Sequence, residues 1–232
     1  MRIGRAKMET LVKYLLTRVG ERITQRTIYK LNATVNYLEV GRWMHSKGYD
    51  TTYRFDRREQ LWDVVGAQVG DRDVLYMEFG VYEGAATRYW SKLLSSPRSK
   101  LHGFDSFEGL PESWLPQRRE GHFSVAGAVP QIDDCRVEFF KGWFDETLPE
   151  YKCPPHDVLV LNLDADLYSS TISVLKLLED YILQGTYIYF DEFNHQFHEL
   201  RAFDEFITKT GMRFSLLGVT RTLEHALFQR MS

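Results

Sequence analysis

The amino-acid sequence predicts an α/β fold built on a doubly wound, mostly parallel β-sheet. From about residue 72 onward, short apolar runs alternate with stretches of helical periodicity, which is the pattern of consecutive β-α-β units. The chain has 232 residues, enough for one such domain with an appendage. Its composition, 44% hydrophobic and 26% charged, is that of a folded globular chain rather than a disordered one.

The N-terminal part, residues 1–62, is expected to be a helical extension ahead of a main domain at 63–232. Its first 30 residues hold eight Lys and Arg against two Glu, and apolar residues recur among them at helical spacing. These apolar residues are Met8, Leu11, Val12, Leu15, Leu16, Val19 and Ile23. A second helical stretch follows at 28–43, and the aromatic segment 49–55 bridges to the main domain.

Several roles are open for the basic N-terminal helix. Its apolar stripe could pack on the main domain or on a second subunit, which makes a homodimer plausible. It could instead form a lid over a substrate pocket, or lie on an anionic membrane surface as a peripheral contact. No membrane-spanning segment is expected, because the longest apolar runs are far shorter than the roughly 20 residues that a span needs.

Seven strands are expected in the main domain. Five should form the parallel core of the sheet, at residues 74–79, 100–104, 136–140, 157–163 and 186–190. The last two, 213–219 and 225–231, are joined by a short polar connection, which requires antiparallel pairing. Helices are expected at 85–94, 171–183 and 197–208. Ligands of such sheets bind at the carboxyl ends of the strands.

The first core strand leads into a loop that suits a nucleotide-type cofactor. Glu78 is followed by Gly80, which permits a tight turn, and by Gly84, which lets the backbone approach a ligand. Tyr82 stands where a dinucleotide-binding loop needs its second glycine, so NAD-type cofactors are disfavoured. The second strand ends at Asp105, whose carboxylate could accept hydrogen bonds from both hydroxyls of a ribose. Alone, each feature could be an ordinary loop or turn.

The fourth and fifth core strands both end in acidic residues. Asp164 and Asp166 follow the fourth strand, and Asp191 and Glu192 follow the fifth. Carboxylates gathered at one edge of a sheet repel each other unless some are protonated or a cation lies among them. Mg²⁺ suits ligation by oxygen atoms, at about 2.1 Å. We therefore expect Asp164, Asp191 and Glu192 to bind Mg²⁺. For Asp166 we expect an interaction with the N-terminus of the next helix.

Five short motifs stand in one order along residues 74–208. They are Glu78-x-Gly80-Val81-x-x-Gly84, Gly103-Phe104-Asp105-Ser106-Phe107-Glu108-Gly109-Leu110-Pro111, Gly142-Trp143-Phe144-x-x-Thr147-Leu148-Pro149, Asp164-x-Asp166-x-Tyr168 and Asp191-Glu192-Phe193. Together they resemble class I S-adenosylmethionine-dependent methyltransferases, and more narrowly the macrocin O-methyltransferase (TylF-like) family, which methylates sugar hydroxyls on macrolide antibiotics. The resemblance implies a Rossmann-like fold, S-adenosyl-L-methionine as methyl donor and Mg²⁺ as metal cofactor.

The resemblance also implies roles for individual residues. Glu78, Gly80 and Gly84 would shape the methionine end of the cofactor pocket. Asp105 would hold the ribose, and the turn at Gly142-Trp143-Phe144 would lie near the adenine. The full cofactor-binding set is Glu78, Gly80, Gly84, Thr87, Asp105, Ser106, Gly142, Trp143 and Phe144. The metal would bind to the same three acids that the strand ends predict.

Two positions depart from the pattern of related enzymes. Macrolide-sugar members tend to carry Asp-Asp where this chain has Asp191-Glu192, and the longer side chain of Glu192 could shift or loosen the metal. Catechol and caffeoyl-CoA methyltransferases carry a lysine where this chain has Leu167, so a lysine base of that type is not expected. Substrate choice usually resides outside the shared motifs, where the similarity is weak.

The expected reaction is methyl transfer to a hydroxyl of a sugar or glycoside, in a natural product, a glycolipid or a polysaccharide. Such a hydroxyl is a poor nucleophile, so the protein must align the reactants, exclude water and supply a base. Binding to the metal would lower the pKa of the hydroxyl, which places Asp164 in the catalytic set. His122 and His195 are the candidate bases.

Two other functions are compatible with part of the sequence. A metal-dependent glycosyltransferase could use Asp164-Ala165-Asp166 with a nucleotide sugar, although it would not need the loop from Glu78 to Gly84. A non-catalytic scaffold could bind S-adenosylmethionine and use the basic helix to recruit a membrane or a partner.

Charge and cysteine content disfavour further classes. The net charge of -3 provides no overall attraction to nucleic acid. Cys135 and Cys153 are the only cysteines and form no Cys-x-x-Cys motif, so neither a disulfide framework nor a thiolate zinc site is expected. The reducing cytoplasm is therefore the expected location.

Overall fold

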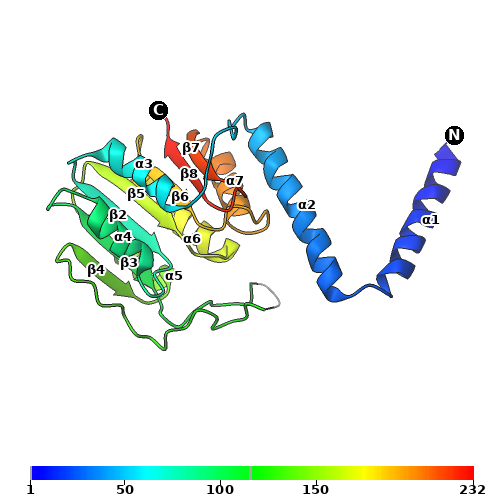
Figure 1. The fold of residues 1–232 in the computed structure, drawn as a ribbon, viewed down its shortest axis with the longest axis horizontal. Coiled ribbons are helices and arrows are strands. Elements are labelled where there is room, and N and C mark those ends of the chain that lie inside the picture. Colours follow the sequence, from blue (N-terminus) through cyan, green and yellow to red (C-terminus); the bar gives the residue numbers. More distant parts are fainter. Residues whose placement is uncertain (1, 115–116) are drawn as a thin grey trace.

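An eight-stranded β-sheet lies at the centre of the structure, a computed structural model that describes residues 2–114 and 117–232 (Figure 1). Its strands are β1 (Arg54–Phe55), β2 (Val74–Phe79), β3 (Lys100–Asp105), β4 (Val137–Lys141), β5 (Val158–Leu163), β6 (Tyr187–Phe190), β7 (Phe214–Thr220) and β8 (Ala226–Arg230). They lie side by side in the order β1-β7-β8-β6-β5-β2-β3-β4. β8 runs antiparallel to β6 and β7, and the other neighbouring strands are parallel.

This sheet confirms the predicted α/β class, with a mostly parallel core and an antiparallel C-terminal strand pair. All seven predicted strands are present, each within one residue of its expected bounds. The eighth, β1, extends one edge by pairing Arg54 with Val219 and Phe55 with Thr220. It comes from the aromatic segment that was expected only to bridge two parts of the chain. Two residues are too few for a strand pattern of alternating polar and apolar side chains.

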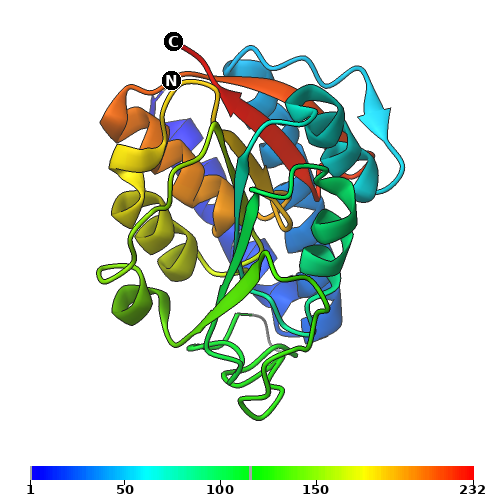
Figure 2. The same cartoon turned by 90° about the vertical axis from the view of Figure 1, so that its left-hand side faces the viewer.

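Helices cover both faces of the sheet (Figure 2). One face carries α3 (Glu59–Val69) and α4 (Ala85–Leu93), whose apolar side chains share a core with the sheet. The other face carries α5 (Phe144–Thr147), α6 (Tyr168–Leu177) and α7 (Glu199–Thr210), which share a second core. Because helices cover both faces, the central strands β2 and β5 are buried along their whole length.

The structure corrects two expectations about helices. The helix expected at 171–183 begins earlier, at Tyr168, and ends at Leu177, before a single 3-10 turn at Glu179–Tyr181. α3 was not predicted, and it runs across the expected domain boundary at residue 62. Its Leu61 and Trp62 are buried in the core beside the sheet, so α3 packs as part of the main domain.

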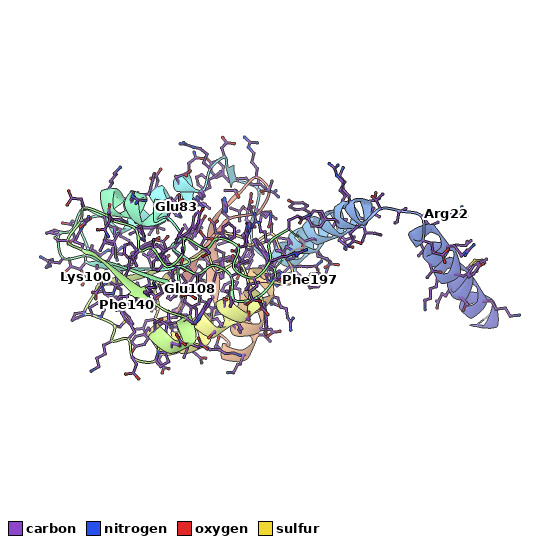
Figure 3. All side chains as sticks on the ribbon, turned by 90° about the horizontal axis from the view of Figure 1, so that it is seen from below. Arg22, Glu83, Lys100, Glu108, Phe140 and Phe197 are labelled. Carbon is purple, nitrogen blue, oxygen red and sulfur yellow. The ribbon has the colours of Figure 1, made fainter. Side chains whose placement is uncertain are left out.

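Two N-terminal helices form an arm that projects from the main domain (Figures 1 and 3). α1 (Arg2–Gly20) is the outer part, and α2 (Gln25–Ser46) joins it to the domain. Val40, Trp43 and Met44, near the end of α2, are buried against the domain. In the described part of the chain, no helix combines the length and apolar character required to cross a membrane.

The strand register brings the ends of four strands to one edge of the sheet. Glu78 of β2 pairs with Gly103 of β3 and with Asn162 of β5, and β6 ends beside β5. Gly80 follows β2 with a positive φ of 92°, and a Cβ atom there would lie 1.9 Å from the carbonyl oxygen of Asp164. Only glycine permits this close approach between the ends of β2 and β5.

Candidate active site

A cavity of about 920 Å³ opens at the carboxyl ends of β2, β3, β5 and β6. Each of these strand ends contributes to its lining, through Gly80, Asp105, Asp164 and Asp191 respectively. The order of strands across the sheet reverses direction between β2 and β5, and open α/β sheets bind ligands at such a point. The volume is that of a small-molecule site.

Glu78 is a buried acid in the lining of this cavity. It is 1% exposed, and its Oε2 accepts hydrogen bonds from the hydroxyls of Tyr76, at 3.0 Å, and Thr87, at 2.5 Å. Burial raises the pKa of Glu78 to about 8, although the two hydrogen bonds act in the opposite direction. A cationic ligand would therefore be favoured beside this acid, because it would stabilise the ionised form.

The carboxylate of Asp105 organises the loop after β2. Its Oδ2 accepts hydrogen bonds from the backbone N–H groups of Val81 and Tyr82, each at 2.8 Å. Its Oδ1 accepts another from the N–H of Phe107 at 2.7 Å. A carboxylate has about four acceptor positions, so roughly one remains for a ribose hydroxyl. The expected role in binding ribose thus stays a prediction, while the role in shaping the loop is visible.

The predicted cofactor residues fall into two groups. Those that line the cavity are Glu78, Gly80, Asp105, Ser106, Trp143 and Phe144. Gly84, Thr87 and Gly142 do not line it. Thr87 instead holds Glu78, and Gly84 begins α4 with a left-handed φ of 76°. Gly142 leads into Trp143, the N-cap residue of α5. These three residues therefore position neighbours that face the cavity.

Four acidic side chains line another part of the cavity: Asp164, Asp166, Asp191 and Glu192. Burial and the neighbouring charge of Asp191 raise the pKa of Asp164 well above its usual value. Burial and the charge of Glu192 raise the pKa of Asp166 to about 8. Burial and Asp191 raise the pKa of Glu192 to about 7. Burial and mutual repulsion therefore favour the protonated forms of these acids unless a cation lies among them.

Two arginines reach this acidic group, and neither was predicted from the sequence. Arg58, at the start of α3, donates from Nη1 to both carboxylate oxygens of Asp191, at 3.0 and 3.2 Å. Arg118 Nη1 lies 3.5 Å from a carboxylate oxygen of Glu192 and 4.0 Å from one of Asp166. Arg58 and Asp191 are 133 residues apart in the chain, so no local motif could have paired them.

The chemistry of the three expected metal ligands fits Mg²⁺, whereas the arrangement of their side chains does not form a finished site. Asp164, Asp191 and Glu192 offer oxygen atoms only, and a divalent cation would relieve their buried negative charge. However, the Asp191 carboxylate already forms an ion pair with Arg58, and the Glu192 carboxylate forms one with Arg118. Among the described residues, no group of three His, Cys, Asp or Glu is arranged to hold a metal ion. Both carboxylate oxygens of Asp191 accept hydrogen bonds from Arg58, and one oxygen of Glu192 faces Arg118 at 3.5 Å, so a metal would compete with both arginines.

Asp166 does not cap the helix that follows it. The N-cap residue of α6 is Leu167, and no side chain makes a capping hydrogen bond there. Asp166 has a left-handed backbone with φ of 59°, is 7% exposed and lines the cavity. Asp is among the few L residues that adopt this conformation readily, and the turn points Asp166 into the acidic group rather than to the N-terminus of α6.

The two candidate histidine bases lie outside the cavity lining. His122 is exposed, and its ring packs against that of Phe123 with centroids 4.4 Å apart. His195 is half-buried between the rings of Trp114 and His198, and burial lowers its pKa. The assignment of either histidine as the base therefore remains a prediction without geometric support.

Two curated proteins from Streptomyces are similar to this chain. The 8-demethyl-8-(2,3-dimethoxy-alpha-L-rhamnosyl)-tetracenomycin-C 4'-O-methyltransferase of Streptomyces olivaceus is 30% identical over 139 residues, which cover 50% of this chain and 52% of that protein. The demethyldecarbamoylnovobiocin O-methyltransferase of Streptomyces niveus is 27% identical over 185 residues, 71% of this chain and 68% of that protein. The similarity thus spans about half of the first relative.

Solved structures with the same fold are also similar. The O-methyltransferase NovP has a TM-score of 0.57 at 26% identity and matches 75% of this chain and 78% of its own. The calicheamicin methyltransferase CalS11 has a TM-score of 0.59 at 22% identity and matches 84% of this chain and 91% of its own. At that identity CalS11 supports the fold alone.

The family assignment rests on a longer match. The model of one protein family, described as Macrocin-O-methyltransferase (TylF), matches residues 51–223. This range contains the loop after β2, the acidic ends of β5 and β6, and both arginines of the cavity. The chain belongs to the macrocin O-methyltransferase (TylF) family.

Proposed function

We propose that this protein is a sugar O-methyltransferase, which transfers a methyl group from S-adenosylmethionine to a hydroxyl of a glycoside. The observation that carries the proposal is a single cavity that joins the loop after β2 to the acidic ends of β5 and β6. A donor held at the loop and an acceptor held at the acids would meet within one enclosure, which aligned transfer requires. Family membership and the two Streptomyces relatives support the same activity.

The methyl donor is assigned to the part of the cavity lined by Glu78, Gly80 and Asp105. S-Adenosylmethionine is cationic at its sulfonium and ammonium groups, and this cavity is rich in acids. Glu78 would ionise and pair with a cationic group of the donor. Trp143 and Phe144 provide aromatic surface for the adenine.

Mg²⁺ is proposed as the second cofactor, with Asp164, Asp191 and Glu192 as its protein ligands. If held there, Mg²⁺ would supply a Lewis acid that lowers the pKa of an acceptor hydroxyl. In this assignment the metal would compete with Arg58 for Asp191 and with Arg118 for Glu192.

Asp166 is better placed than either histidine to accept the proton of the acceptor hydroxyl. It lines the cavity, and its pKa of about 8 lies near the range in which a general base works best. We expect Asp166→Asn to lower kcat by about 100-fold or more, since general bases contribute that much, with unchanged affinity for S-adenosylhomocysteine. The double variant His122→Asn, His195→Asn should keep nearly full activity. A large loss of kcat in the double variant would instead identify one of the two histidines as the general base.

A glycosyltransferase fits the cavity less well. The described lining contains eleven Asp and Glu but two cationic side chains, Arg58 and Arg118, and both are paired with acids. The diphosphate of a nucleotide sugar would therefore meet like charge without a free cation. A non-catalytic scaffold would bind the donor but would show no turnover with any glycoside. We place the activity in the cytoplasm, where Cys135 and Cys153 would remain the free thiols seen here.

Calorimetric titration with S-adenosylhomocysteine tests the proposal first. We expect micromolar binding of S-adenosylhomocysteine and of S-adenosylmethionine, with and without Mg²⁺, and no binding of UDP- or GDP-sugars. Methyl transfer to a panel of rhamnosides and other glycosides would then be measured with and without a chelator. Binding of a nucleotide sugar alone would replace methyl transfer by glycosyl transfer, and donor binding without turnover would favour the scaffold.

A further inference from the structure

Two exposed aromatic side chains meet at the open side of the cavity. Tyr82 lies in the loop after β2, and Phe123 lies in the longer loop between β3 and β4, which extends beyond the edge of the sheet (Figure 1). Both residues line the cavity, and they are 44% and 36% exposed. Their ring centroids are 5.8 Å apart, with an angle of 70° between the ring planes. The two rings therefore form an apolar corner that a ligand in the cavity can reach.

The backbone at both positions is strained and firmly held. Tyr82 has a φ of 52° and Phe123 a φ of 68°, in the left-handed region that bulky L residues rarely adopt. The N–H of Tyr82 donates a hydrogen bond to Oδ2 of Asp105 at 2.8 Å. Just before Phe123, the carbonyl oxygen of His122 accepts one from the N–H of Leu110 at 2.9 Å. Strain that the surrounding structure maintains in this way is typical of ligand sites, where it fixes the direction of a side chain.

Arg118 connects this corner with the acidic group of the cavity. Its guanidinium carbon lies 5.3 Å from the centre of the Phe123 ring and 4.4 Å from that of the buried Trp114. The same guanidinium lies 3.5 Å from a carboxylate oxygen of Glu192 and 4.0 Å from one of Asp166. Phe123 and the acids thus contact one side chain from different sides. A ligand with its reacting hydroxyl at the acids could therefore place an adjoining ring in the corner.

We propose that Tyr82 and Phe123 form a subsite that binds the aglycone of the acceptor, and that this aglycone presents a flat, apolar ring. The subsite rests on the proposed function, since the acids are then left to the sugar whose hydroxyl is methylated. Two exposed rings that meet at an angle gain contact and release water when a third ring packs against them. A diphosphate in place of the aglycone would enter a cavity in which Arg58 and Arg118 are already paired with acids.

The adenine of the donor is the competing occupant of the corner. Trp143 and Phe144, which line the cavity from the turn after β4, already provide aromatic surface for it. Phe123, in contrast, shares Arg118 with the acidic group at which the acceptor reacts. The corner therefore belongs to the acceptor side of the cavity. An interaction that the aglycone makes equally before and during methyl transfer lowers KM and leaves kcat unchanged.

Initial rates with 2-naphthyl and methyl α-L-rhamnoside test the proposal, because these glycosides offer the same sugar hydroxyls with and without a flat aglycone. We expect the wild type to have the lower KM for the naphthyl glycoside. Tyr82→Asn and Phe123→Asn should each raise that KM by about fivefold or more, with kcat and the KM for the methyl glycoside unchanged. Asn is chosen because it tolerates left-handed backbone, so both variants should fold.

Two further variants are controls. Tyr82→Phe keeps the ring without its hydroxyl and should keep the wild-type KM for the naphthyl glycoside. Tyr53→Asn removes one ring of another exposed aromatic pair, in which Tyr53 and Phe55 lie 5.2 Å apart outside the cavity lining, and it should change neither KM. Equal KM values for the two glycosides in the wild type would overturn the proposal. So would a KM for the naphthyl glycoside that both Asn variants leave unchanged.

Binding measurements separate this subsite from the donor site and from the proposed function. Tyr82→Asn and Phe123→Asn should bind S-adenosylhomocysteine with wild-type affinity by calorimetry. Lost donor affinity with an unchanged KM for the naphthyl glycoside would assign the corner to the donor and overturn the proposal. If no glycoside is methylated, the proposed function fails, and fluorescence anisotropy of the naphthyl glycoside bound to the S-adenosylhomocysteine complex still tests the subsite. Weaker binding by the Asn variants would support it, and equal binding would overturn it.

Discussion

Glu78 and the hydroxyls of Tyr76 and Thr87 form a buried polar group behind the cofactor loop. All three residues are at most 1% exposed, and the Asn162 side-chain amide donates a further hydrogen bond to the Tyr76 hydroxyl at 2.8 Å. This network holds the Glu78 carboxyl in place whatever its charge. The pKa of Glu78 is raised to about 8, so Glu78 is mostly protonated at neutral pH. A cationic ligand that binds beside it would favour loss of this proton.

We expect Glu78→Gln to weaken binding of S-adenosylhomocysteine by about tenfold or more, because hydrogen bonds to a charged group contribute about 1.5–3 kcal/mol. Since Gln has nearly the same shape, thermal unfolding should change little. Calorimetry in buffers of different ionisation enthalpy should detect proton release with the wild type and none with the variant. Glu83→Gln, on the exposed part of the same loop, is the control. Equal affinities of the two variants would contradict this role of Glu78.

Arg118 competes with the expected metal for Glu192. We expect Arg118→Gln to raise the affinity for Mg²⁺ several-fold, because the metal then need not displace a guanidinium from that carboxylate. Arg119→Gln removes an exposed neighbouring charge outside the cavity lining and should have little effect. Titration with Mg²⁺ in the presence of S-adenosylhomocysteine measures both. A weaker metal site in the Arg118 variant would mean that the arginine supports the site instead.

At the scale of secondary-structure elements, the site depends on how closely the ends of the parallel strands approach. β2 and β5 pair from Val74 and Val158 to Phe79 and Leu163, and the next N–H, that of Asp164, donates to the carbonyl oxygen of Phe79 at 2.9 Å. Gly80 then turns away with no side chain between it and Asp164. This approach places the cofactor loop next to the first acid of the proposed metal site.

Gly80→Ala should destabilise the protein more than Gly185→Ala does. Both glycines have φ near 90°, but a Cβ at Gly80 would meet the Asp164 backbone, whereas a Cβ at Gly185 would have no atom within 4 Å. We expect a loss of about 1–2 kcal/mol for Gly185→Ala from backbone strain, and a clearly larger loss for Gly80→Ala. Denaturant unfolding measures both. Similar losses would show that the end of β5 can move aside.

At the scale of the whole molecule, the buried acids make folding depend on pH. In the folded state the pKa values of Glu78 and Asp166 are about 8 and that of Glu192 is about 7, whereas unfolded carboxyls titrate near pH 4. Between these values the folded state binds more protons than the unfolded state. The stability that these protonated acids contribute is therefore complete below about pH 4 and is lost as the pH rises through about 7–8.

We expect metal-free protein to have a Tm several degrees lower at about pH 8.5 than at about pH 6, since each kcal/mol shifts the Tm of a chain of this size by roughly 2–4 °C. Mg²⁺ should restore more of the Tm at the higher pH, because it binds the ionised acids. In Asp166→Asn the decline with pH should be shallower. Scanning calorimetry with a chelator or with Mg²⁺ checks this, and a Tm that rises with pH would refute it.

The strands and the edge that holds the site could be predicted because their signals are local. Apolar runs separated by helical stretches predicted the seven longer strands. In the observed strand order, Asp105, Asp164 and Asp191 lie at one edge of the sheet. The short edge strand β1 was missed because two residues are too few to show a strand pattern, and α3 was missed because it crosses the boundary that was drawn at residue 62.

Only the tertiary structure decided how the site is charged and which side chains reach it. Arg58 and Arg118 come from segments distant in sequence, and their pairing with Asp191 and Glu192 depends on packing of α3 and of the loop after β3. Burial, which no local pattern specifies, sets the protonation of Glu78. The sequence by itself determined the α/β class, the motifs of the family and the acids of the strand ends. Three-dimensional packing decided their neighbours and their charge, because electrostatic energies depend on distance and on exclusion of water.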